Sequence, residues 1–488
     1  MDSTQWSHEW VSRIEVKGTQ SYRVPALHTH HSYLRTRPPF KGLAYRVAAL
    51  LLAIFILACV REDGPARARE DVTQTLASTT AAIETAPTPL RADPARGVWV
   101  LAEGAVRVLD DPTRIEPLLE RATALGVTDL FVQVYRGGRA FYAAGPGIER
   151  TPTAFVHAAA GIDPLAQLIS SAKTRGFKVH AWVNVLSLSA RRDADMIRDL
   201  GRGAVLVDRM GRSVLDYPDL DLPQPDRRFY RMGTRGVYLD PGVPAVRERL
   251  VTTYVDLLQR YPDLDGLHLD YIRHPGVLPF SPGSRFGVGL EFGYGEQSRA
   301  RYRAETGRPD PIDSARPGTV RSANTWDAWR RDQVTQLVEE IAEAARLARP
   351  GVVVSAAVIP YVDRAYLSLA QDWRNWLETG ALDLAIPMAY TLDDRLLRYQ
   401  LESFAGWPQA DRIWPGLGVW LFDDRPERAV EQLALLRGLG FTGEMLFSED
   451  AIAESPELMD ALAATRLHKV DLGLNDNTKA AASPGATP

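Results

Sequence analysis

The stretch from Leu264 to Pro275 reads Leu-Asp-Gly-Leu-His-Leu-Asp-Tyr-Ile-Arg-His-Pro, and the fold can be read outward from it. Its first half alternates as a β-strand does, so Gly266, His268 and Asp270 share one face and the leucines share the other. A buried carboxylate is costly unless it is paired or used, and ligands bind at the carboxyl ends of parallel strands. We therefore predict that Asp270 is a catalytic residue.

Strand-like segments recur on both sides of this stretch, and each is followed by a helical segment. Strict alternation of eight such units is the signature of a (β/α)₈ TIM barrel, an α/β fold. The other predicted strands are Gly97–Glu103, Val127–Tyr135, Phe177–Val185, Val352–Ile359, Leu382–Tyr390, Ile413–Phe422 and Phe441–Ser448. The predicted helices are Pro112–Leu125, Pro164–Arg175, Pro244–Arg260, Ala323–Ala348, Asp372–Glu378, Asp393–Glu402, Pro426–Leu439 and Ser455–Leu467.

Two long irregular segments interrupt this pattern, from Leu186 to about Val237 and from Gly276 to Gly318. They follow the third and fourth strands, so both insertions should lie at the carboxyl-terminal face, where barrel enzymes place their active sites. An open doubly wound sheet is the alternative fold. It would need a glycine-rich turn after the first strand, and Ala102-Glu103-Gly104 is not one.

The N-terminal region carries the marks of export. An apolar run from Val47 to Ala58 follows Lys41 and Arg46 and ends at Cys59, the only cysteine of the chain. The run suits a signal-peptide core better than a membrane span, which needs about 20 apolar residues. Ile56-Leu57-Ala58-Cys59 resembles the lipobox of bacterial lipoproteins, which predicts a lipid on Cys59.

Four segments follow from these patterns: a lipoprotein-type leader over 1–59, a flexible linker over 60–96, the barrel over 97–467 and a disordered tail over 468–488. Val60, which follows the cysteine, favours an outer-membrane anchor facing the periplasm; an uncleaved N-terminal anchor is the alternative. The net charge is only -4 and no dense basic block occurs in the barrel, which argues against nucleic-acid binding.

Several motifs in chain order resemble the glycosyl hydrolase-like family 10 domain, a (β/α)₈ group of secreted or lipid-anchored bacterial proteins. The matching residues are Arg96–Trp99, His180–Asn184, Asp265–Arg273, Trp326, Trp329-Arg330, Asp372-Trp373, Asp383 and Pro387–Tyr390. The resemblance implies hydrolysis of a glycosidic bond in a cell-envelope polysaccharide such as the peptidoglycan glycan. The fourth-strand motif also looks like that of the α-amylase clan, but no carboxylate follows strand five here, between Val352 and Pro360.

Glycoside hydrolysis normally uses two carboxylates, and Asp270 supplies one of them. The second is not fixed by the sequence. We rank Glu103 first because it ends the first predicted strand without an evident capping role. The other candidates are Asp393, Asp394, Asp423, Asp424 and Glu449, whereas Glu444 opens strand eight and should lie at the stability face.

His180, Trp182 and Asn184 alternate inward on the third strand and suit a sugar subsite of stacking and hydroxyl contacts. Singly, an inward histidine or aromatic ring is more often part of a core. The predicted subsite is completed by residues at four strand ends: Tyr135, His268, Tyr271, Arg273, Tyr390 and Trp420.

His180, His268 and Asp270 are not expected to form a metal site. Metal-dependent barrel hydrolases usually carry a His-x-His pair on the first strand, and Trp99 and Leu101 occupy those positions here. No cofactor is expected. Two functions follow: an active glycosidase, or a glycan-binding envelope lipoprotein that has lost turnover. The missing strand-five acid favours the second.

Overall fold

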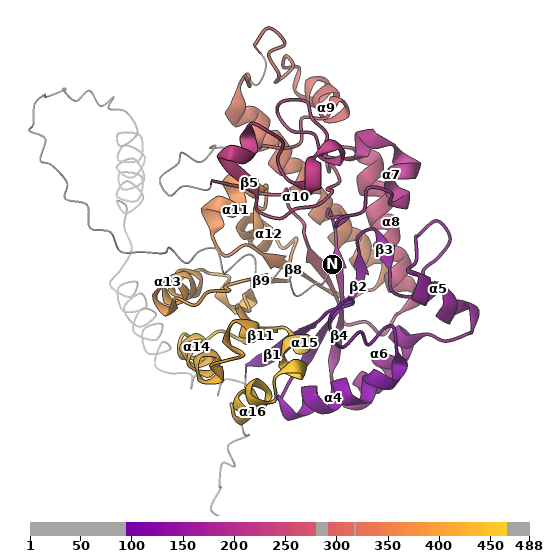
Figure 1. The fold of residues 1–488 in the computed structure, drawn as a ribbon, viewed down its shortest axis with the longest axis vertical. Helices are drawn as coiled ribbons and strands as arrows, with labels where there is room; N and C mark the ends of the chain where they lie inside the picture. Colours follow the sequence, from indigo (N-terminus) through magenta and orange to yellow (C-terminus); the bar gives the residue numbers. More distant parts are fainter. Residues whose placement is uncertain (1–93, 280–290, 317–318, 466–488) are drawn as a thin grey trace, which may run out of the picture. The chain divides into compact units, whose positions relative to one another are not determined.

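The computed structural model describes residues 94–279, 291–316 and 319–465. Eight parallel strands form one sheet in the order β10-β11-β1-β2-β4-β6-β8-β9 (Figure 1). Bridges from Ala385 to Ile413 and from Met388 to Gly416 bring the two ends of this order together. The sheet is therefore a nearly closed barrel, and the predicted TIM-barrel fold is confirmed. The strands are β1 (Ala95–Val100), β2 (Asp129–Arg136), β4 (Lys178–Asn184), β6 (Gly266–Asp270), β8 (Val353–Val358), β9 (Leu384–Pro387), β10 (Gly416–Gly418) and β11 (Gly443–Phe447).

Helices cover the outside of the barrel, and local sequence sets their ends. Asp163 caps α6 by accepting a hydrogen bond from the backbone N–H of Ala166, and Pro164 opens its first turn. Gly176 then leaves the helix with a φ of 80°, a conformation that glycine adopts without strain. The helices that follow the eight strands are α4 (Ile115–Ala124), α6 (Pro164–Thr174), α8 (Pro244–Arg260), α10 (Ala323–Ala348), α11 (Val362–Leu369), α12 (Trp373–Glu378), α13 (Asp394–Ala405), α14 (Pro426–Gly438), α15 (Glu449–Glu454) and α16 (Pro456–Ala464).

The two insertions pack on each other at the carboxyl-terminal side of the strands. The first runs from β4 to α8 and contains α7 (Asp195–Leu200) and β5 (Tyr230–Met232), and the second contains β7 (Val277–Pro279) and α9 (Glu296–Thr306). β5 and β7 pair in antiparallel register, and the hydroxyl of Ser298 donates to the buried carboxylate of Asp240 at 2.8 Å. Backbone pairing and a buried polar bond thus join segments that are far apart in the chain.

The structure differs from the sequence expectations in several local features. β1 ends at Val100, so Glu103 lies in the loop that follows it, and strand seven is reduced to Gly416–Gly418 with a 3₁₀ turn over Val419–Phe422. A third excursion, not predicted, follows β2 and holds β3 (Arg139–Ala140) and α5 (Pro152–Ala159). Short strands with early turns carry too little alternation for sequence patterns to place their ends.

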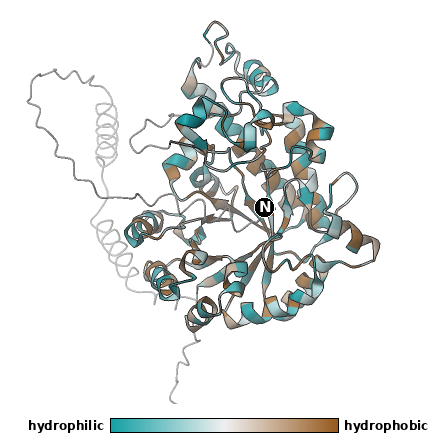
Figure 2. Ribbon diagram, in the orientation of Figure 1, coloured by the Kyte–Doolittle hydropathy of each residue, from teal (hydrophilic) through white to brown (hydrophobic). Residues whose placement is uncertain are grey.

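Aromatic and aliphatic side chains fill the inside of the barrel, and the central strands are largely apolar (Figure 2). Trp99 is 1% exposed and crosses the interior to Gly416, where a Cβ atom would lie 2.9 Å from its ring. Glycine at this point of strand seven therefore makes room for the largest side chain of the interior.

The amino-terminal end of the barrel is held by a buried ionic cluster. Arg96 of β1 donates from Nε to Glu444 of β11 at 2.7 Å, and Arg437 of α14 donates from Nη2 to the same oxygen at 2.7 Å. The Glu444 side chain is 1% exposed. Its position at the start of strand eight is the one expected for a structural residue.

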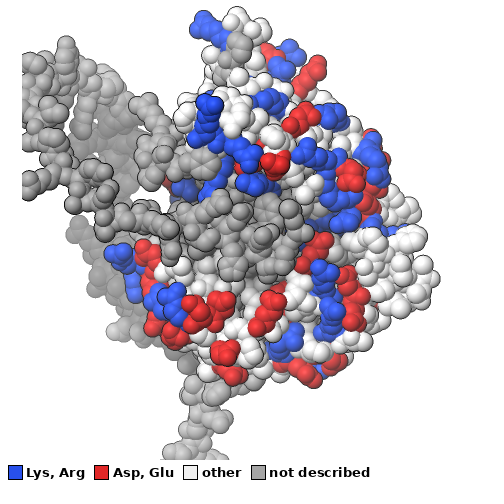
Figure 3. Space-filling model, viewed as in Figure 1, with Lys and Arg blue, Asp and Glu red and all other residues white. Residues whose placement is uncertain are grey.

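The surface of the described residues carries both signs of charge. Figure 3 shows basic and acidic side chains interspersed over the barrel and its insertions on the face in view. None of the described helices is long and apolar enough to cross a membrane. The leader, Cys59, most of the linker and the predicted tail lie outside the described residues.

Replacing Glu444 by Gln should lower the free energy of unfolding by about 3–5 kcal/mol, because it leaves two guanidinium groups without their buried counter-charge. Urea titration of the parent and of the variant measures this difference. Glu402→Gln is the matched control: Glu402 pairs with Arg398 at 3.9 Å on the surface of α13, and its loss should cost about 0.5 kcal/mol or less. Equal effects of the two changes would contradict a structural role for the buried cluster.

Candidate active site

Asp270 lies at the carboxyl-terminal end of β6 and is 6% exposed. Its Oδ2 accepts the indole N–H of Trp182 at 3.2 Å, and its Oδ1 accepts the backbone N–H of Tyr271 at 2.7 Å. Burial raises the pKa of Asp270, and the Arg273 guanidinium and these two hydrogen bonds oppose that increase. A partly desolvated carboxylate at a barrel mouth is suited to acid–base or charge-stabilising chemistry.

Arg273 is the cation beside this carboxylate. It is 6% exposed, its guanidinium carbon lies 4.8 Å from the centre of the Tyr271 ring, and its Nε has no hydrogen-bond partner among the described residues. Tyr271 has a φ of 52°, which is unusual for a residue with a bulky side chain. The chain thus turns sharply after Asp270, and Arg273 comes back beside the end of the strand.

Polar side chains from the neighbouring strands surround Asp270. Asn184 ends β4 directly beside Asp270 in the strand register. Gln133 of β2 donates from Nε2 to Asn184 Oδ1 at 3.2 Å and accepts the backbone N–H of Ala102 at 3.3 Å. Sequence reasoning missed Gln133, although its alternation with Phe131 on strand two was available as a signal. Trp182 and Asn184 thus lie at the mouth, as predicted from the sequence.

Four rings form a cluster, which we call the aromatic floor, and one of them, Trp182, is hydrogen-bonded to Asp270. Trp99 is at its centre, with Trp182 and Tyr390 at ring distances of 6.5 Å and Phe447 at 5.7 Å. The Tyr390 ring lies 5.4 Å from Phe447, and its hydroxyl is buried without a partner among the described residues. Burial, followed by the Asp270 and Tyr271 charges, raises the pKa of Tyr390 well above its usual value.

Trp420 also lies near this mouth, although not on a strand. It belongs to the 3₁₀ turn after β10, where its indole nitrogen and the Tyr390 ring both lie close to Gly418. Tyr390, Trp420, Tyr271 and Arg273 are therefore together at one end of the barrel.

His268 is deeper than we predicted from the sequence. It is fully buried, its Nε2 accepts the indole N–H of Trp99 at 3.1 Å, and its Nδ1 lies 2.9 Å from the hydroxyl of Ser355. Burial lowers the pKa of His268 well below its usual value. These contacts fit a neutral ring with its proton on Nδ1. His268 holds Trp99 in place from below, and nothing in its contacts supports the predicted bond to a sugar.

His180 lies still deeper in the barrel, farther from the carboxyl-terminal ends of the strands than His268. Its Nε2 lies 2.9 Å from Asp129 Oδ1 at the start of β2, and its ring stacks on Phe131 at 4.3 Å. Gly266 leaves the space that this ring occupies. His180 is four residues below Asn184, about 13 Å along the strand. Its contacts are those of a core residue, so the predicted subsite loses this member, and His180, His268 and Asp270 do not converge on one point.

Tyr135 faces the helix layer and not the mouth. Its hydroxyl donates to the sulfur of Met196 at 3.7 Å, and its ring packs edge-on against Tyr254 of α8. The strand register shifts between Gln133 and Tyr135. A bulge changes which face the next side chains occupy, and simple alternation along strand two therefore gave the wrong face for Tyr135.

Glu103, predicted as the second carboxylate, lies on the rim. Its side chain is 38% exposed and pairs with Arg136 at 3.0 Å and with Arg139 at 3.7 Å. Arg136 also acts on Asp270, because its charge contributes to lowering the pKa of that carboxylate. The charge of Arg136 thus acts on both acids, and the catalytic role of Glu103 stays a prediction.

The other acidic candidates have structural partners. Asp393 caps α13, and Asp394 pairs with Arg428 at 2.8 Å. Asp423 and Asp424 lie on the surface after the 3₁₀ turn. Glu449 is fully buried and pairs with Arg121 of α4 at 2.7 Å; burial raises its pKa to about 7 despite that cation. Because α4 belongs to the outer layer, Glu449 points away from the mouth.

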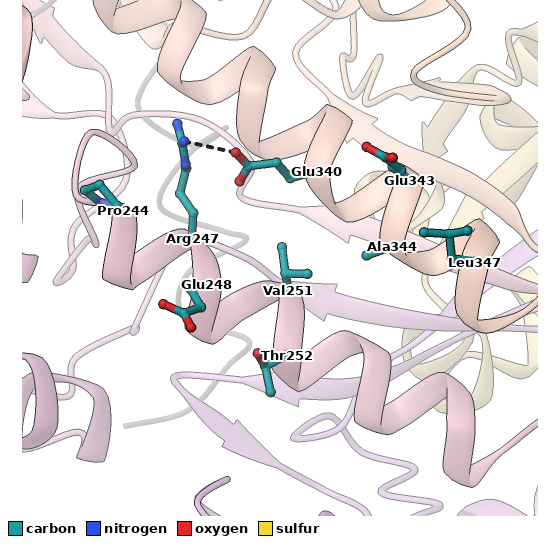
Figure 4. Close-up of a pocket in the computed structure, with 9 residues that line it drawn as sticks. All are labelled: Pro244, Arg247, Glu248, Val251, Thr252, Glu340, Glu343, Ala344 and Leu347. Carbon is teal, nitrogen blue, oxygen red and sulfur yellow. Dashed lines mark ion pairs between the residues drawn. The ribbon is translucent and has the colours of Figure 1, made fainter.

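A separate open groove lies on the outer helix layer between α8 and α10 (Figure 4). The ion pair between Arg247 and Glu340, at 2.9 Å, crosses it, and Val251 and Leu347 add apolar surface. None of the residues around Asp270 lines this groove. Among the described residues, no three His, Cys, Asp or Glu side chains come together as a metal site.

Comparison with known proteins identifies relatives over most of the chain. The profile of the glycosyl hydrolase-like 10 family matches residues 94–411. Glycosyl hydrolase DigH of Escherichia coli K12 is 24% identical over 475 residues, which cover 87% of this chain and 97% of DigH. Glycosyl hydrolase YngK of Bacillus subtilis is 26% identical over 320 residues, which cover 60% of this chain and 54% of YngK.

Solved structures agree on the fold. The PgaB (BpsB) glycoside hydrolase domain from Bordetella bronchiseptica matches with a TM-score of 0.53 and 18% identity, covering 76% of this chain and 98% of that domain. A β-galactosidase from G. stearothermophilus matches with a TM-score of 0.50 and 12% identity, covering 76% of this chain and 56% of that protein. At such identities the likeness concerns the barrel architecture alone.

Replacing Arg273 by Gln should raise the pKa of Asp270 further, because it removes the cation that most strongly opposes the effect of burial. The carboxylate would then form only at higher pH, which carbon-detected NMR titration of the Asp270 carboxyl group measures. Arg331→Gln is the control, since Arg331 also lies over a tyrosine ring, that of Tyr366 at 4.0 Å, but does not act on Asp270. An unchanged or lower pKa in Arg273→Gln would show that this cation does not stabilise the carboxylate.

Proposed function

The chain belongs to the glycosyl hydrolase-like 10 family, and we propose that it is a glycosidase of the bacterial cell envelope that cleaves the glycan of peptidoglycan. The family resemblance read from the motifs around Asp270 agrees with the profile match. The fold supports the proposal because glycoside hydrolases are among the proteins that share this barrel. The polysaccharide and the chemistry below are our proposal.

The observation that carries the proposal is the setting of Asp270. It is a buried carboxylate at the end of a strand that accepts an indole N–H and a backbone N–H, and the charge of Arg273 favours its ionised form. Glu444, by contrast, is a buried acid bound into ion pairs with direct salt-bridge geometry. No basic side chain among the described residues pairs directly with Asp270, so this carboxylate keeps acceptor capacity for a substrate.

The chemistry assigns different tasks to two acids. Hydrolysis of a glycosidic bond requires one acid that protonates the departing oxygen and one carboxylate that attacks the anomeric carbon or activates the water that attacks it, and this water supplies the new hydroxyl of that carbon. Asp270 is suited to the second task, because Arg273 and the two N–H groups favour its charged form. Glu103 on the rim is the acid that we propose for the first task, released from Arg136 when substrate displaces that cation.

The location follows from the N-terminal sequence. The basic flank, the apolar run and Cys59 support a lipid-anchored protein of the outer membrane that faces the periplasm. The chain from Val60 to Arg96 would then link the lipid to the barrel. A polysaccharide of the same compartment is the natural partner of such a protein.

A glycan-binding lipoprotein without turnover is the second candidate. The observation that favours it is the lack of an evident second catalytic acid. Strand five ends without a carboxylate, and Asp394 and Glu449 form ion pairs with Arg428 and Arg121. If Glu103 does not act as the acid, Asp270 would serve binding alone.

Asp270→Asn should reduce the release of new reducing ends from isolated peptidoglycan glycan strands by about 10²- to 10⁴-fold, because the neutral amide cannot stabilise positive charge. The amide keeps an acceptor for Trp182 or Tyr271, so the fold should persist, which thermal unfolding checks. Asp394→Asn, which changes the acid that opens α13 and pairs with Arg428 in the helix layer, should keep full activity. Binding of strands without release by the parent protein would establish the binding lipoprotein instead.

Cys59→Ala should abolish incorporation of a fatty-acid label when the full chain is produced in a Gram-negative host, because the thiol is the proposed attachment point. Gel detection of an alkyne-tagged palmitate measures the label. Val60→Ala, a change at the next residue, should leave labelling intact. Labelling that persists in Cys59→Ala would refute the lipid-anchor prediction.

A further inference from the structure

We propose that the ends of β6 and β9 recognise the 2-acetamido group of an N-acetylated sugar. In this arrangement Asp270 accepts the amide N–H, and Tyr390 donates its hydroxyl hydrogen to the amide carbonyl oxygen. The methyl group rests on the aromatic floor. The inference rests on the proposed function, since it concerns the sugar that lies at the same site.

The first argument is the Tyr390 hydroxyl. It is buried and has no hydrogen-bond partner among the described residues. An unsatisfied buried hydroxyl costs about 1–3 kcal/mol, so such a group calls for an explanation. Among the described residues the hydroxyls of Tyr142, Tyr238 and Tyr254 are also buried without a partner, but of the four tyrosines only Tyr390 belongs to the aromatic floor.

The second argument is the acceptor capacity of Asp270. A carboxylate offers about four lone-pair directions, and the protein uses two of them, one for Trp182 and one for Tyr271. An additional N–H can therefore be accepted without breaking an existing bond. The site then presents one acceptor and one donor, which matches the N–H and C=O of a secondary amide.

The third argument is the apolar surface between these two groups. Trp99 links Trp182, which holds Asp270, to Tyr390, with both rings 6.5 Å from its own. Phe447 closes the other side of Tyr390 at 5.4 Å. A small apolar group held between a donor and an acceptor would contact these rings, and the methyl of an acetamido group has that position.

Other sugar substituents fit this arrangement less well. A hydroxyl at the same carbon offers its donor and its acceptor on one atom and would leave the rings without an apolar partner. A free amine would be cationic and would pair with Asp270, but it offers no acceptor to the Tyr390 hydroxyl, carries no apolar group for the rings, and would also meet the charges of Arg273 and Arg136. The acetamido group is neutral, bipolar and partly apolar, and it satisfies all three features.

The test compares three forms of one ligand: peptide-free glycan strands, the same strands after chemical N-deacetylation, and deacetylated strands that have been N-acetylated again. Isothermal titration calorimetry with the full-length protein should show affinity at least tenfold weaker for the deacetylated strands. Reacetylation should restore the original affinity, which controls for damage to the chain. Deacetylated strands that bind equally well or more tightly would overturn the inference.

The Tyr390→Phe variant tests whether the Tyr390 hydroxyl is the group that binds the acetamido carbonyl oxygen. The variant should weaken binding of acetylated strands about tenfold and leave binding of deacetylated strands unchanged, because only the acetylated ligand offers the carbonyl oxygen. Tyr254→Phe removes an equally buried, unpartnered hydroxyl in the helix layer and should change neither affinity. An equal loss for both ligands in Tyr390→Phe would mean that the hydroxyl supports the fold and does not read the acetamido group.

Reducing-end assays on the same three ligands separate this inference from the proposed function. An acetyl-dependent affinity without release from any strand would refute the glycosidase and leave acetamido recognition standing. Equal release from acetylated and deacetylated strands would keep the glycosidase and refute the recognition. Failure of the parent protein to bind the intact strands would also overturn the inference.

Discussion

The cost of holding a carboxylate at the end of a buried strand is the constraint that organises this protein. Burial disfavours the charged form of Asp270, and the surrounding groups offset that penalty without forming a closed ion pair. Trp182 supplies an N–H from the next strand, the turn at Tyr271 supplies another, and Arg273 returns beside the carboxylate because of that turn. The start of the second insertion is therefore part of the same electrostatic arrangement as the strand that precedes it.

The interior of the barrel supports this arrangement from below. Trp99 is fixed by the imidazole of His268, which is in turn oriented by Ser355, so three strands meet through two hydrogen bonds between side chains. Large rings leave little freedom once such bonds exist, and Gly416 gives the space that Trp99 needs. The aromatic floor is consequently preorganised, because the ring at its centre is held by a hydrogen bond within the barrel.

Sequence alternation could predict the barrel and the facing of its strands, but not the depth of each side chain. His180, Trp182 and Asn184 all point inward, yet only the last two reach the mouth, because depth depends on how neighbouring strands are staggered. Alternation also fails for facing where a strand is irregular: the register shift between Gln133 and Tyr135 leaves Gln133 inside and turns Tyr135 to the helix layer. Glu103 lies beyond the end of β1, where alternation has no meaning, and a long-range pair with Arg136 sets its position.

The difference between Glu444 and Asp270 shows how one fold separates stability from chemistry. Both are buried acids at strand ends, but Glu444 receives two guanidinium groups at 2.7 Å, whereas no basic side chain in the described part of the chain forms a direct salt bridge with Asp270. Fully paired charges hold elements together and resist replacement of their partners by a ligand. An acid that is satisfied only in part can exchange partners with a substrate, and it lies beside a tyrosine hydroxyl that is also unsatisfied. The ion pairs of Glu444, which stabilise the fold, therefore lie at the amino-terminal end of the barrel. Asp270 and the Tyr390 hydroxyl, whose hydrogen-bonding capacity is not fully used by the described residues, lie at the carboxyl-terminal end.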